Sequence, residues 1–403
     1  MHRSPLISLV LAPLVLQALA RPHCNTLANG KAIYMLSNEQ DNAVVALPIQ
    51  KNGLLAAGRL TGTGGAGMNG MDADGKPAAP DPLFSQSSLT IAGNHLFAVN
   101  PGSNTVSMFA IDPRDPTRLT LVGQPVAVPG EFPVTVAASE RNKLVCVGSS
   151  GAVAGVACST FSADGIGEMD DLRVFDIGQT TPPVGPTNTV SHVFFSRDES
   201  TVFTTVKGDP ATNKTGFLAA FPVDRSDCEA GASVAREGRR SSPAGTAVLF
   251  GSSTIPGSDD LFVTDASFGG AVLTNGGGRG GDAAAFTVRG KGVVDGQSAT
   301  CWAAISPATN TAFVTDVGVN RLVEMSLGDA SIRSVVDLGA NGDPGLIDLR
   351  AAGRLVYALS PGNGTTPAAV TVVDAVTKKQ VQHLQFNGGM RFGKNAQGMA
   401  LLM

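Results

Sequence analysis

Short apolar runs separated by polar bends recur along the whole chain. The clearest example is FAVNPGSNTVSMFAID at residues 97–112, in which two alternating apolar runs flank a bend at residues 100–104. Alternation with a period of two, interrupted by Asn, Pro and Gly, predicts a β-hairpin. Related segments begin at six other positions: Tyr34, Leu144, Phe203, Phe262, Phe313 and Tyr357. The sequence therefore predicts seven hairpins.

A further short apolar strand precedes most of these hairpins. Such strands are expected at residues 88–91, 134–137, 190–195, 246–250, 302–305 and 345–349. They begin roughly 45 to 57 residues apart, which is the period of a four-stranded propeller blade and is not explained by a β-sandwich. The hairpin at Tyr34 lacks this strand, but residues 398–402 at the end of the chain are apolar. We therefore predict an all-β fold, a seven-bladed β-propeller closed by pairing the C-terminal strand with the N-terminal blade, which removes open sheet edges.

The first twenty residues differ from the rest of the chain. Arg3 precedes a continuous apolar stretch, and small residues stand at Ala18 and Ala20. This order is typical of a secretory signal peptide, so we expect residues 1–20 to be removed and residues 21–403 to form a single propeller. A membrane anchor is the alternative, but the apolar stretch is short for a span and is interrupted by Pro13. We therefore expect secretion and no membrane span.

Composition narrows the set of partners. The formal net charge is −4 and no basic stripe is present, which argues against nucleic acid as a partner. Hydrophobic residues make up 43% of the chain, enough for a sizeable core, and we expect a monomer. The Gly-rich stretch at residues 61–75 lacks the Lys-Ser/Thr ending of a phosphate loop, and we interpret it as a flexible connection.

Two cysteines flank one Gly-rich turn. Cys146 and Cys158 lie on either side of a turn near Ala152, so they would face each other across one hairpin, and we predict a disulfide between them. Among the three others, Cys24, Cys228 and Cys301, we expect one further bridge and one free thiol. Two glycosylation sequons begin at Asn213 and Asn363, which agrees with secretion.

Polar residues stand at the ends of the apolar strands. In a propeller, the residues before each innermost strand and those after each second strand converge on one mouth of the central channel. The first set is Gln86, Glu131, Asn188, Ser242, Gln297, Asp343 and Gln397, and the second is Ser37, Asn100, Ser149, Lys207, Asp265, Asp316 and Ser360. Such residues often only form turns. Charged residues are scarce in this chain, however, and four of them would gather at this mouth.

We take the four charged residues, Glu131, Lys207, Asp265 and Asp316, as candidate catalytic residues. A ring of one cation and several carboxylates can bind an anionic or hydroxylated small molecule and shift its own pKa values. Asn100, Asn188, Gln297 and Asp343 are candidate ligand-binding residues of the same mouth. No cofactor is expected; a divalent metal held by Glu131, Asn188, Asp265 and Asp316 is the alternative.

The blade sequences resemble a known family. FAVNPGSNTVSMFAID, SNEQDNAVVALPI and TDVGVNRLVEMSL are similar to the Y-V-x-N-x-x-x-N-T-V-S-V-F signature of the seven-bladed propeller lactonases, which include 6-phosphogluconolactonase and the fungal 3-carboxy-cis,cis-muconate lactonising enzyme. The stretches GQTTPPVGPTNTVS, RSSPAGTAVLFG, TCWAAISPATNTAFVTDVGVN and YALSPGNGTTPAAVTVVD resemble a secreted fungal branch described as carboxymuconate cyclases, which includes a cell-wall glycoprotein adhesin. The resemblance implies the propeller fold and secretion.

The resemblance also suggests an activity. Lactone chemistry needs a general acid or base near the ring oxygen and a cation for the carboxylates. The family has a His at the start of one inner strand; in NTVSHVFFSRDES its position falls on Ser191, which we include among the ligand-binding candidates. His192 is one residue away and would face the other side of the strand, so we interpret it as structural.

Two functions remain open. One is a secreted lactonase or lactonising cyclase that binds a small carboxylated or sugar-derived ring at one mouth of the channel. The other is a non-catalytic secreted or cell-wall glycoprotein that binds a host or cell-wall ligand on a rigid propeller. The lost His and the sequons favour the second, and the polar mouth favours the first.

Overall fold

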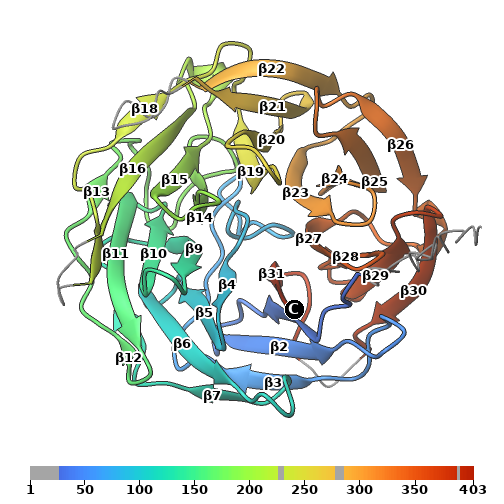
Figure 1. Cartoon of the computed structure of the whole chain (residues 1–403), viewed down its shortest axis with the longest axis horizontal. Helices are drawn as coiled ribbons and strands as arrows, with labels where there is room; N and C mark the ends of the chain where they lie inside the picture. Colours follow the sequence, from blue (N-terminus) through green and yellow to red (C-terminus); the bar gives the residue numbers. More distant parts are fainter. Residues whose placement is uncertain (1–26, 226–230, 277–285, 388–390) are drawn as a thin grey trace, which may run out of the picture.

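The computed structural model describes residues 27–225, 231–276, 286–387 and 391–403. Within these ranges seven antiparallel sheets are arranged as blades around a central axis (Figure 1). Helical structure in the described ranges is confined to two 3₁₀ turns, η1 (Pro210–Thr212) and η2 (Gly339–Asn341). The seven-bladed propeller predicted from the hairpin pattern is confirmed. The expected signal peptide, residues 1–20, lies outside the described residues.

Each blade runs outward from the central channel, beginning with its innermost strand. The first contains β31 (Gln397–Leu402), β1 (Ala32–Leu36), β2 (Ala43–Pro48) and β3 (Arg59–Gly62). The second contains β4 (Leu89–Ala92), β5 (His95–Asn100), β6 (Thr105–Ile111) and β7 (Leu119–Leu121), with β8 (Val126–Ala127) also on β6. The third contains β9 (Pro133–Ser139), β10 (Leu144–Ser149), β11 (Gly155–Ser162) and β12 (Gly165–Ile166), with β13 (Arg173–Val174) also on β11.

The other four blades follow the same plan. The fourth contains β14 (Val190–Phe195), β15 (Thr201–Val206), β16 (Phe217–Arg225) and β17 (Ala232–Val234), with β18 (Arg239–Ser241) also on β16. The fifth contains β19 (Leu249–Thr254), β20 (Leu261–Asp265), β21 (Gly269–Asn275) and β22 (Phe286–Val293). The sixth contains β23 (Thr300–Ser306), β24 (Thr311–Asp316), β25 (Val319–Ser326) and β26 (Ile332–Asp337), and the seventh contains β27 (Ile347–Ala352), β28 (Leu355–Ser360), β29 (Ala369–Asp374) and β30 (Lys379–Gln385).

The two ends of the chain close the ring. β31 pairs antiparallel with β1, with Tyr34 opposite Ala400 and Ala32 opposite Leu402. The innermost strand of the first blade is thus supplied by the C-terminus, as the sequence predicted. This pairing leaves no unpaired inner edge on the first blade.

Burial explains why the blade sequences are so apolar. The second strand of a blade, such as β5 or β28, is buried along almost its whole length, because neighbouring blades cover both of its faces. The outermost strands β3 and β30 are largely exposed and carry charged and polar residues.

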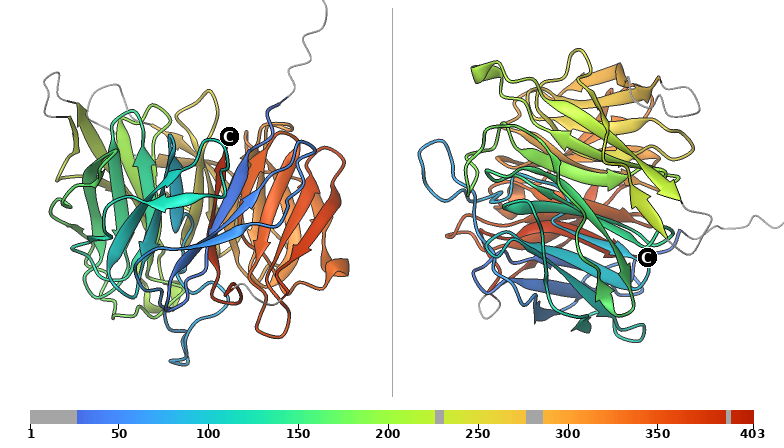
Figure 2. Two further views of the ribbon diagram at one scale, coloured as in Figure 1. Left: turned by 90° about the horizontal axis from the view of Figure 1, so that it is seen from below. Right: turned by 90° about the vertical axis from the view of Figure 1, so that its left-hand side faces the viewer.

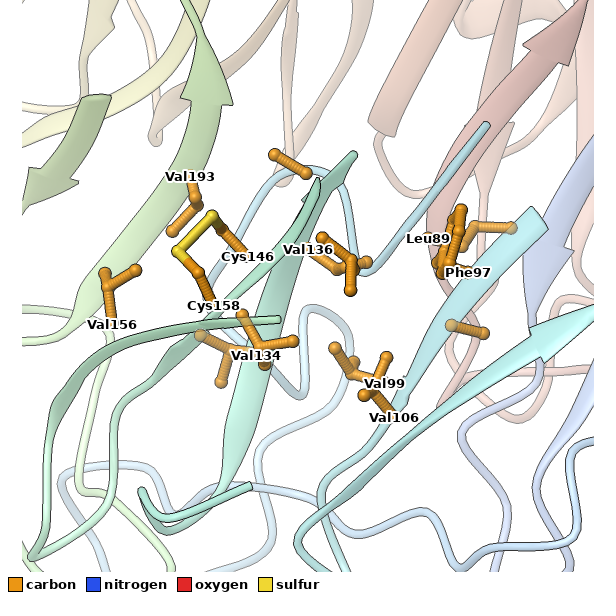
Figure 3. Packing of buried hydrophobic residues seen from close by; sticks show 14 of the residues in the cluster. Leu89, Phe97, Val99, Val106, Val134, Val136, Cys146, Val156, Cys158 and Val193 are labelled. Atoms are coloured by element: carbon orange, nitrogen blue, oxygen red, sulfur yellow. A yellow bond between two sulfur atoms is a disulfide. The ribbon is translucent and has the colours of Figure 1, made fainter. Parts of the chain in front are cut away.

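The disulfide between Cys146 and Cys158 joins directly opposite residues of β10 and β11 and is confirmed. Figure 3 shows it among valines of the same hydrophobic cluster.

One inner strand begins later than the hydrophobic pattern suggests. We expected residues 246–250 in this strand, whereas β19 begins at Leu249. The backbone N–H groups of Ala247 and Val248 are bound by the Asp265 carboxylate, at 2.7 Å and 3.1 Å, rather than by a neighbouring strand. A side-chain contact of this kind competes with strand pairing and cannot be read from the apolar pattern.

A segment between β3 and β4 enters the centre of the ring. In Figure 1 the light-blue chain after β3 runs into the middle of the blades. We call residues 84–87, Phe-Ser-Gln-Ser, the plug. The Ser85 carbonyl accepts hydrogen bonds from Trp302 Nε1 at 3.0 Å and from Gln397 Nε2 at 2.8 Å. Ser85 Oγ donates to the carbonyl of Val134 at 2.7 Å. The plug therefore links the inner strands of three other blades through one residue.

Gln86 extends this network. Its backbone N–H donates to the Ser191 carbonyl at 2.9 Å, and its carbonyl accepts from Thr135 Oγ1 at 2.8 Å. Its side-chain amide bonds both the N–H and the carbonyl of Ala303. A Cβ on Gly251 of β19 would lie 2.1 Å from Gln86 Oε1 and 2.7 Å from the backbone carbonyl oxygen of Cys301, so this position in the fifth blade favours glycine. The plug is thus fixed from several sides of the channel.

The plug separates the two ends of the channel. We call the end where the inner strands begin the start mouth and the opposite end the end mouth. Figure 2 shows a blue loop of the segment before the plug projecting from one face, while the C-terminus, where β31 ends, lies toward the other.

Among the described residues, no helix is long and apolar enough to cross a membrane.

Candidate functional site

A pocket of about 400 Å³ opens at the start mouth. The turns before β14, β19 and β23 and those after β15, β20 and β24 form one side of it. The other side comes from residues 72–84, which precede and begin the plug. The pocket therefore lies where the strand-end residues were expected to converge, and a segment outside the blade repeat completes it.

Lys207 and Asp81 line this pocket as two buried ionisable groups whose charges interact. Lys207 follows β15 and is 1% exposed, and Asp81 is 6% exposed. Lys207 Nζ donates to the carbonyl oxygen of Phe84 and lies 4.3 Å from the centre of the Phe250 ring. Asp81 Oδ1 accepts a hydrogen bond from Gln397 Nε2 at 3.1 Å. The two ionisable groups are thus held by the plug and by inner strands.

Burial shifts the pKa values of this pair toward each other. Loss of hydration raises the pKa of Asp81 and lowers the pKa of Lys207, because both charged forms are less stable away from water. The opposite charge of the partner offsets part of each shift. Groups shifted in this way can exchange protons close to neutral pH, which is the property required of a general acid or base.

Apolar and aromatic side chains form the walls of the pocket. The ring of Phe84 packs against Gly185, where an added Cβ would lie 2.4 Å from a ring carbon. Phe250 meets the indole of Trp302 edge to face, with 4.9 Å between ring centres. Cys301 also lines the pocket, and burial raises the pKa of its thiol, so it stays protonated. A ligand ring would therefore have apolar surroundings and one charged pair.

Of the four candidate catalytic residues, Lys207 lines this pocket. Asp265 instead binds the backbone N–H groups of Ala247, Val248 and Ser267. Asp316 repeats the arrangement in the next blade, with the N–H groups of residues 298, 299 and 318. Because Val248, Ser267 and Ser298 line the pocket, the two carboxylates shape its rim through these turns.

Glu131 and the ligand-binding candidates make contacts within and between blades. Glu131 accepts a hydrogen bond from Thr181 Oγ1. The other contacts are Asn100 Oδ1 with Asn42 Nδ2 at 2.9 Å, Asn188 Nδ2 with the Ile177 carbonyl at 2.8 Å, Ser191 Oγ with the Leu249 carbonyl at 2.9 Å, Gln297 Nε2 with the Ala266 carbonyl at 3.1 Å, and Asp343 with His383 Nε2 at 3.1 Å. None of these residues lines the described start-mouth pocket. Their proposed ligand contacts stay predictions.

The remaining predicted sites have these positions. Asn213 and Asn363, the sequon residues, are exposed. Cys301 is buried and free, whereas Cys24 and Cys228 lie outside the described residues, so the second bridge stays a prediction. Across the described ranges, no group of three or more His, Cys, Asp or Glu side chains is placed to hold a metal ion.

The chain is similar in fold to several solved structures. No family model and no curated protein matches this chain. A periplasmic gluconolactonase of Pseudomonas aeruginosa is 14% identical, with 92% of this chain and 99% of that chain covered and a TM-score of 0.59. A Bacteroides fragilis protein named as a candidate 6-phosphogluconolactonase is 11% identical, covering 93% and 98% at a TM-score of 0.55. The fold is one that lactonases use.

The chain is also similar in fold to a solved protein whose name gives a different activity. The dihydro-heme d1 dehydrogenase NirN, solved in complex with DHE, is 12% identical, with 94% of this chain and 77% of that chain covered and a TM-score of 0.53. At these identities the comparisons show the propeller fold, and one fold carries many functions. The function therefore has to be argued from the pocket.

The sequence reasoning missed Asp81, Phe84 and Cys301 as pocket residues. Asp81 and Phe84 belong to the connection between β3 and β4, which we had interpreted in part as flexible. A connection of this length was itself a signal, because long loops within compact domains are often functional. Cys301 entered the sequence reasoning as either a disulfide partner or a free thiol, not as a pocket residue.

Proposed function

We propose that this chain is a secreted propeller of the lactonase type that binds a small carboxylated or sugar-derived ring in the start-mouth pocket. The observation that carries the proposal is the buried Lys207 beside Asp81 in an apolar-walled pocket of about 400 Å³. A lactone places a small ring and one polarised ester in such a space. The expected signal peptide, the Cys146–Cys158 bridge and the exposed sequons support secretion, and the resemblance to the fungal branch extends the proposal to the cell wall.

The pair supplies the two functions that ring opening needs. Asp81 in its ionised form accepts a proton from water, whose oxygen then attacks the lactone carbonyl carbon. The ammonium of Lys207 donates a hydrogen bond to the oxygen on which negative charge develops. The ring C–O bond breaks and its oxygen takes the proton from Asp81, which leaves a hydroxy acid and restores the Asp81 carboxylate. The reverse course closes a ring.

Activity assays with matched variants test this assignment. The substrates are aldonolactones for hydrolysis and a carboxymuconate for cyclisation, each with and without chelator. Lys207→Met and Asp81→Asn remove the pair. Lys291→Met is the control, because Lys291 Nζ also lies over a phenylalanine, 4.0 Å from the Phe268 ring centre, and donates to a carbonyl. We expect the first two to lower kcat/KM by about 10²-fold or more and the control to retain it. Turnover that survives both changes would overturn the site.

A binding protein without turnover is the second candidate. It is favoured by Glu131, Asp265 and Asp316, whose carboxylates are engaged by a threonine hydroxyl or by backbone N–H groups outside the pocket interior. Saturable binding of an aldonate that Lys207→Met weakens, with no turnover on any substrate, would establish this function, with a small molecule or a cell-wall ligand as the natural partner. Neither binding nor turnover would refute both candidates.

A further inference from the structure

The end mouth carries a second hollow that the proposed function does not use. Two adjoining cavities of about 330 Å³ and 250 Å³ lie there and share Ser87, His192 and Phe194. They are formed by the closing halves of inner strands from several blades, with Gln86 and Ser87 of the plug as the floor. The plug therefore lines the start-mouth pocket with Phe84 and this hollow with Ser87.

A single cation faces the larger cavity. Among the described residues that line it, Arg350 carries the only permanent charge. Its guanidinium is held on one side by Asp348 Oδ1 at 2.5 Å and by the Leu349 carbonyl at 2.7 Å, and its NH2 group donates to Ser87 Oγ at 3.0 Å. Asp348 is fully buried and bound by the N–H groups of Leu349 and Met399, so it lies behind the arginine rather than in the cavity. Arg350 is thus fixed in place, with its side chain 20% exposed.

His192 adds a neutral, oriented imidazole. Burial and the neighbouring Arg350 lower the pKa of His192 to about 3, so the ring is uncharged in the physiological range. Its Nε2 lies 3.1 Å from Ser87 Oγ, and the ring stacks on Phe194 with 4.9 Å between centres. Ser87 Oγ accepts from Arg350 and also bonds Nε2, so the serine joins the guanidinium and the imidazole in one network.

Two buried polar atoms of this cavity lack a partner. Neither His192 Nδ1 nor Ser252 Oγ has a hydrogen bond within the described part of the chain, although both residues are at least nine-tenths buried. Buried polar groups in folded proteins are nearly always satisfied. The guanidinium is a donor only and the Ser252 hydroxyl can donate, so an acceptor that reaches both would satisfy them.

We propose that the end-mouth cavity binds a small organic carboxylate through Arg350 and Ser252. Because the guanidinium already shares its charge with Asp348, a monoanion leaves less uncompensated charge in the cavity than a phosphate dianion would. The walls of Phe194, Phe195 and Ile305 suit an apolar body behind the carboxylate. This site is separate from Lys207 and does not depend on the lactonase proposal.

Calorimetric titration with benzoate, acetate and inorganic phosphate tests the site. We expect one benzoate per chain, weaker acetate binding and weaker phosphate binding still. Arg350→Gln should weaken benzoate binding about tenfold or more, and Ser252→Ala several-fold, as expected for a lost charged and a lost neutral hydrogen bond. The control is Arg354→Gln, which removes another arginine paired with an aspartate, Asp374, at the surface.

The variants also distinguish loss of the binding site from failure to fold, and binding at the end mouth from binding at the start mouth. Ser252 Oγ makes no hydrogen bond to a described residue, so Ser252→Ala should unfold at the same urea concentration as wild type. Equal benzoate affinity in Arg350→Gln and Arg354→Gln, or loss of binding only in Lys207→Met, would overturn the site. Phosphate binding as tight as benzoate would overturn the carboxylate class, and no benzoate binding would refute the proposal even if lactone turnover were found.

Discussion

Replacing Asp81 with asparagine isolates the charge of Lys207 in the interior. Asparagine can still accept the Gln397 hydrogen bond, so the change removes mainly the charge, together with part of the backbone hydrogen bonding from Phe84 and Ser85. Lys207 can then avoid a buried charge only by losing its proton, which from an ordinary pKa of 10.5 costs about 1.4 kcal/mol per pH unit. The cost of deprotonating Lys207, which is the largest loss of stability expected from its charge, is about 5 kcal/mol at pH 7 and about 2 kcal/mol at pH 9. We expect the free energy of unfolding to fall by about 3–5 kcal/mol at pH 7 and by less at pH 9.

Lys207→Met produces the opposite pH dependence. Asp81 then lacks a counter-charge and must hold a proton, which from its ordinary pKa of 3.8 costs up to about 4 kcal/mol at pH 7 but only about 2 kcal/mol at pH 5. In this variant the pKa of Asp81 is higher in the folded state than in the unfolded state. The contribution of Asp81 to stability is therefore complete below the unfolded-state pKa and is lost as the pH rises through the folded-state pKa. A lowered lysine pKa gives stability that grows as the pH rises toward 10.5.

Urea unfolding measures both effects. The single tryptophan, Trp302, is fully buried against Phe250 and bonded to the plug, so its fluorescence reports on this region. The double variant Asp81→Asn/Lys207→Met should lose less than the sum of the single variants, because no unpaired charge remains. Lys291→Met should unfold as wild type. Additive losses, or single variants whose losses change with pH in the same direction, would refute the reasoning.

Three further predictions concern other parts of the fold. Removing the bridge with Cys146→Ala and Cys158→Ala should lower the free energy of unfolding by about 2–3 kcal/mol, and reductant should do the same to wild type, in urea titrations. Arg173→Met should cost about 2–3 kcal/mol in the same assay, because the Arg173 side chain is 2% exposed and bonds Asp170 and two carbonyls of the neighbouring blade. Asn213→Gln and Asn363→Gln should each remove one glycan, measured by intact mass on protein secreted from a eukaryotic host; unchanged masses would contradict this.

The fold was predictable because each blade repeats one local pattern. Alternation around FAVNPGSNTVSMFAID gives the strands, and the seven copies give the blade count. The closure followed from one hairpin without an inner strand and one apolar segment at the far end of the chain. The disulfide was predictable for the same reason, since Cys146 and Cys158 are opposite residues of a single hairpin. These are consequences of local periodicity.

The pocket was less predictable because long-range contacts build it. Lys207 stood out as a charged strand-end residue, but its partner Asp81 comes from a connection with no repeat pattern. Gln86 meets Ala303 across 217 positions of the chain. The same strand-end rule placed Asp265 and Asp316 beside Lys207, yet their carboxylates bind turns. Residue type at a strand end does not distinguish a turn former from a pocket residue.

The plug lies between the two mouths and contacts a cation at each. A propeller ring leaves a central channel that a ligand or water could otherwise enter from both ends, but residues 84–87 bond to inner strands across that space. The backbone carbonyl of Phe84 is directed to the ammonium at one mouth, and the hydroxyl of Ser87 to the guanidinium at the other. Each cation is therefore fixed by a different plug residue and faces a different cavity. Because the two cavities share no lining residue, we expect a ligand at one mouth not to displace a ligand at the other, which competition between the two ligands would test.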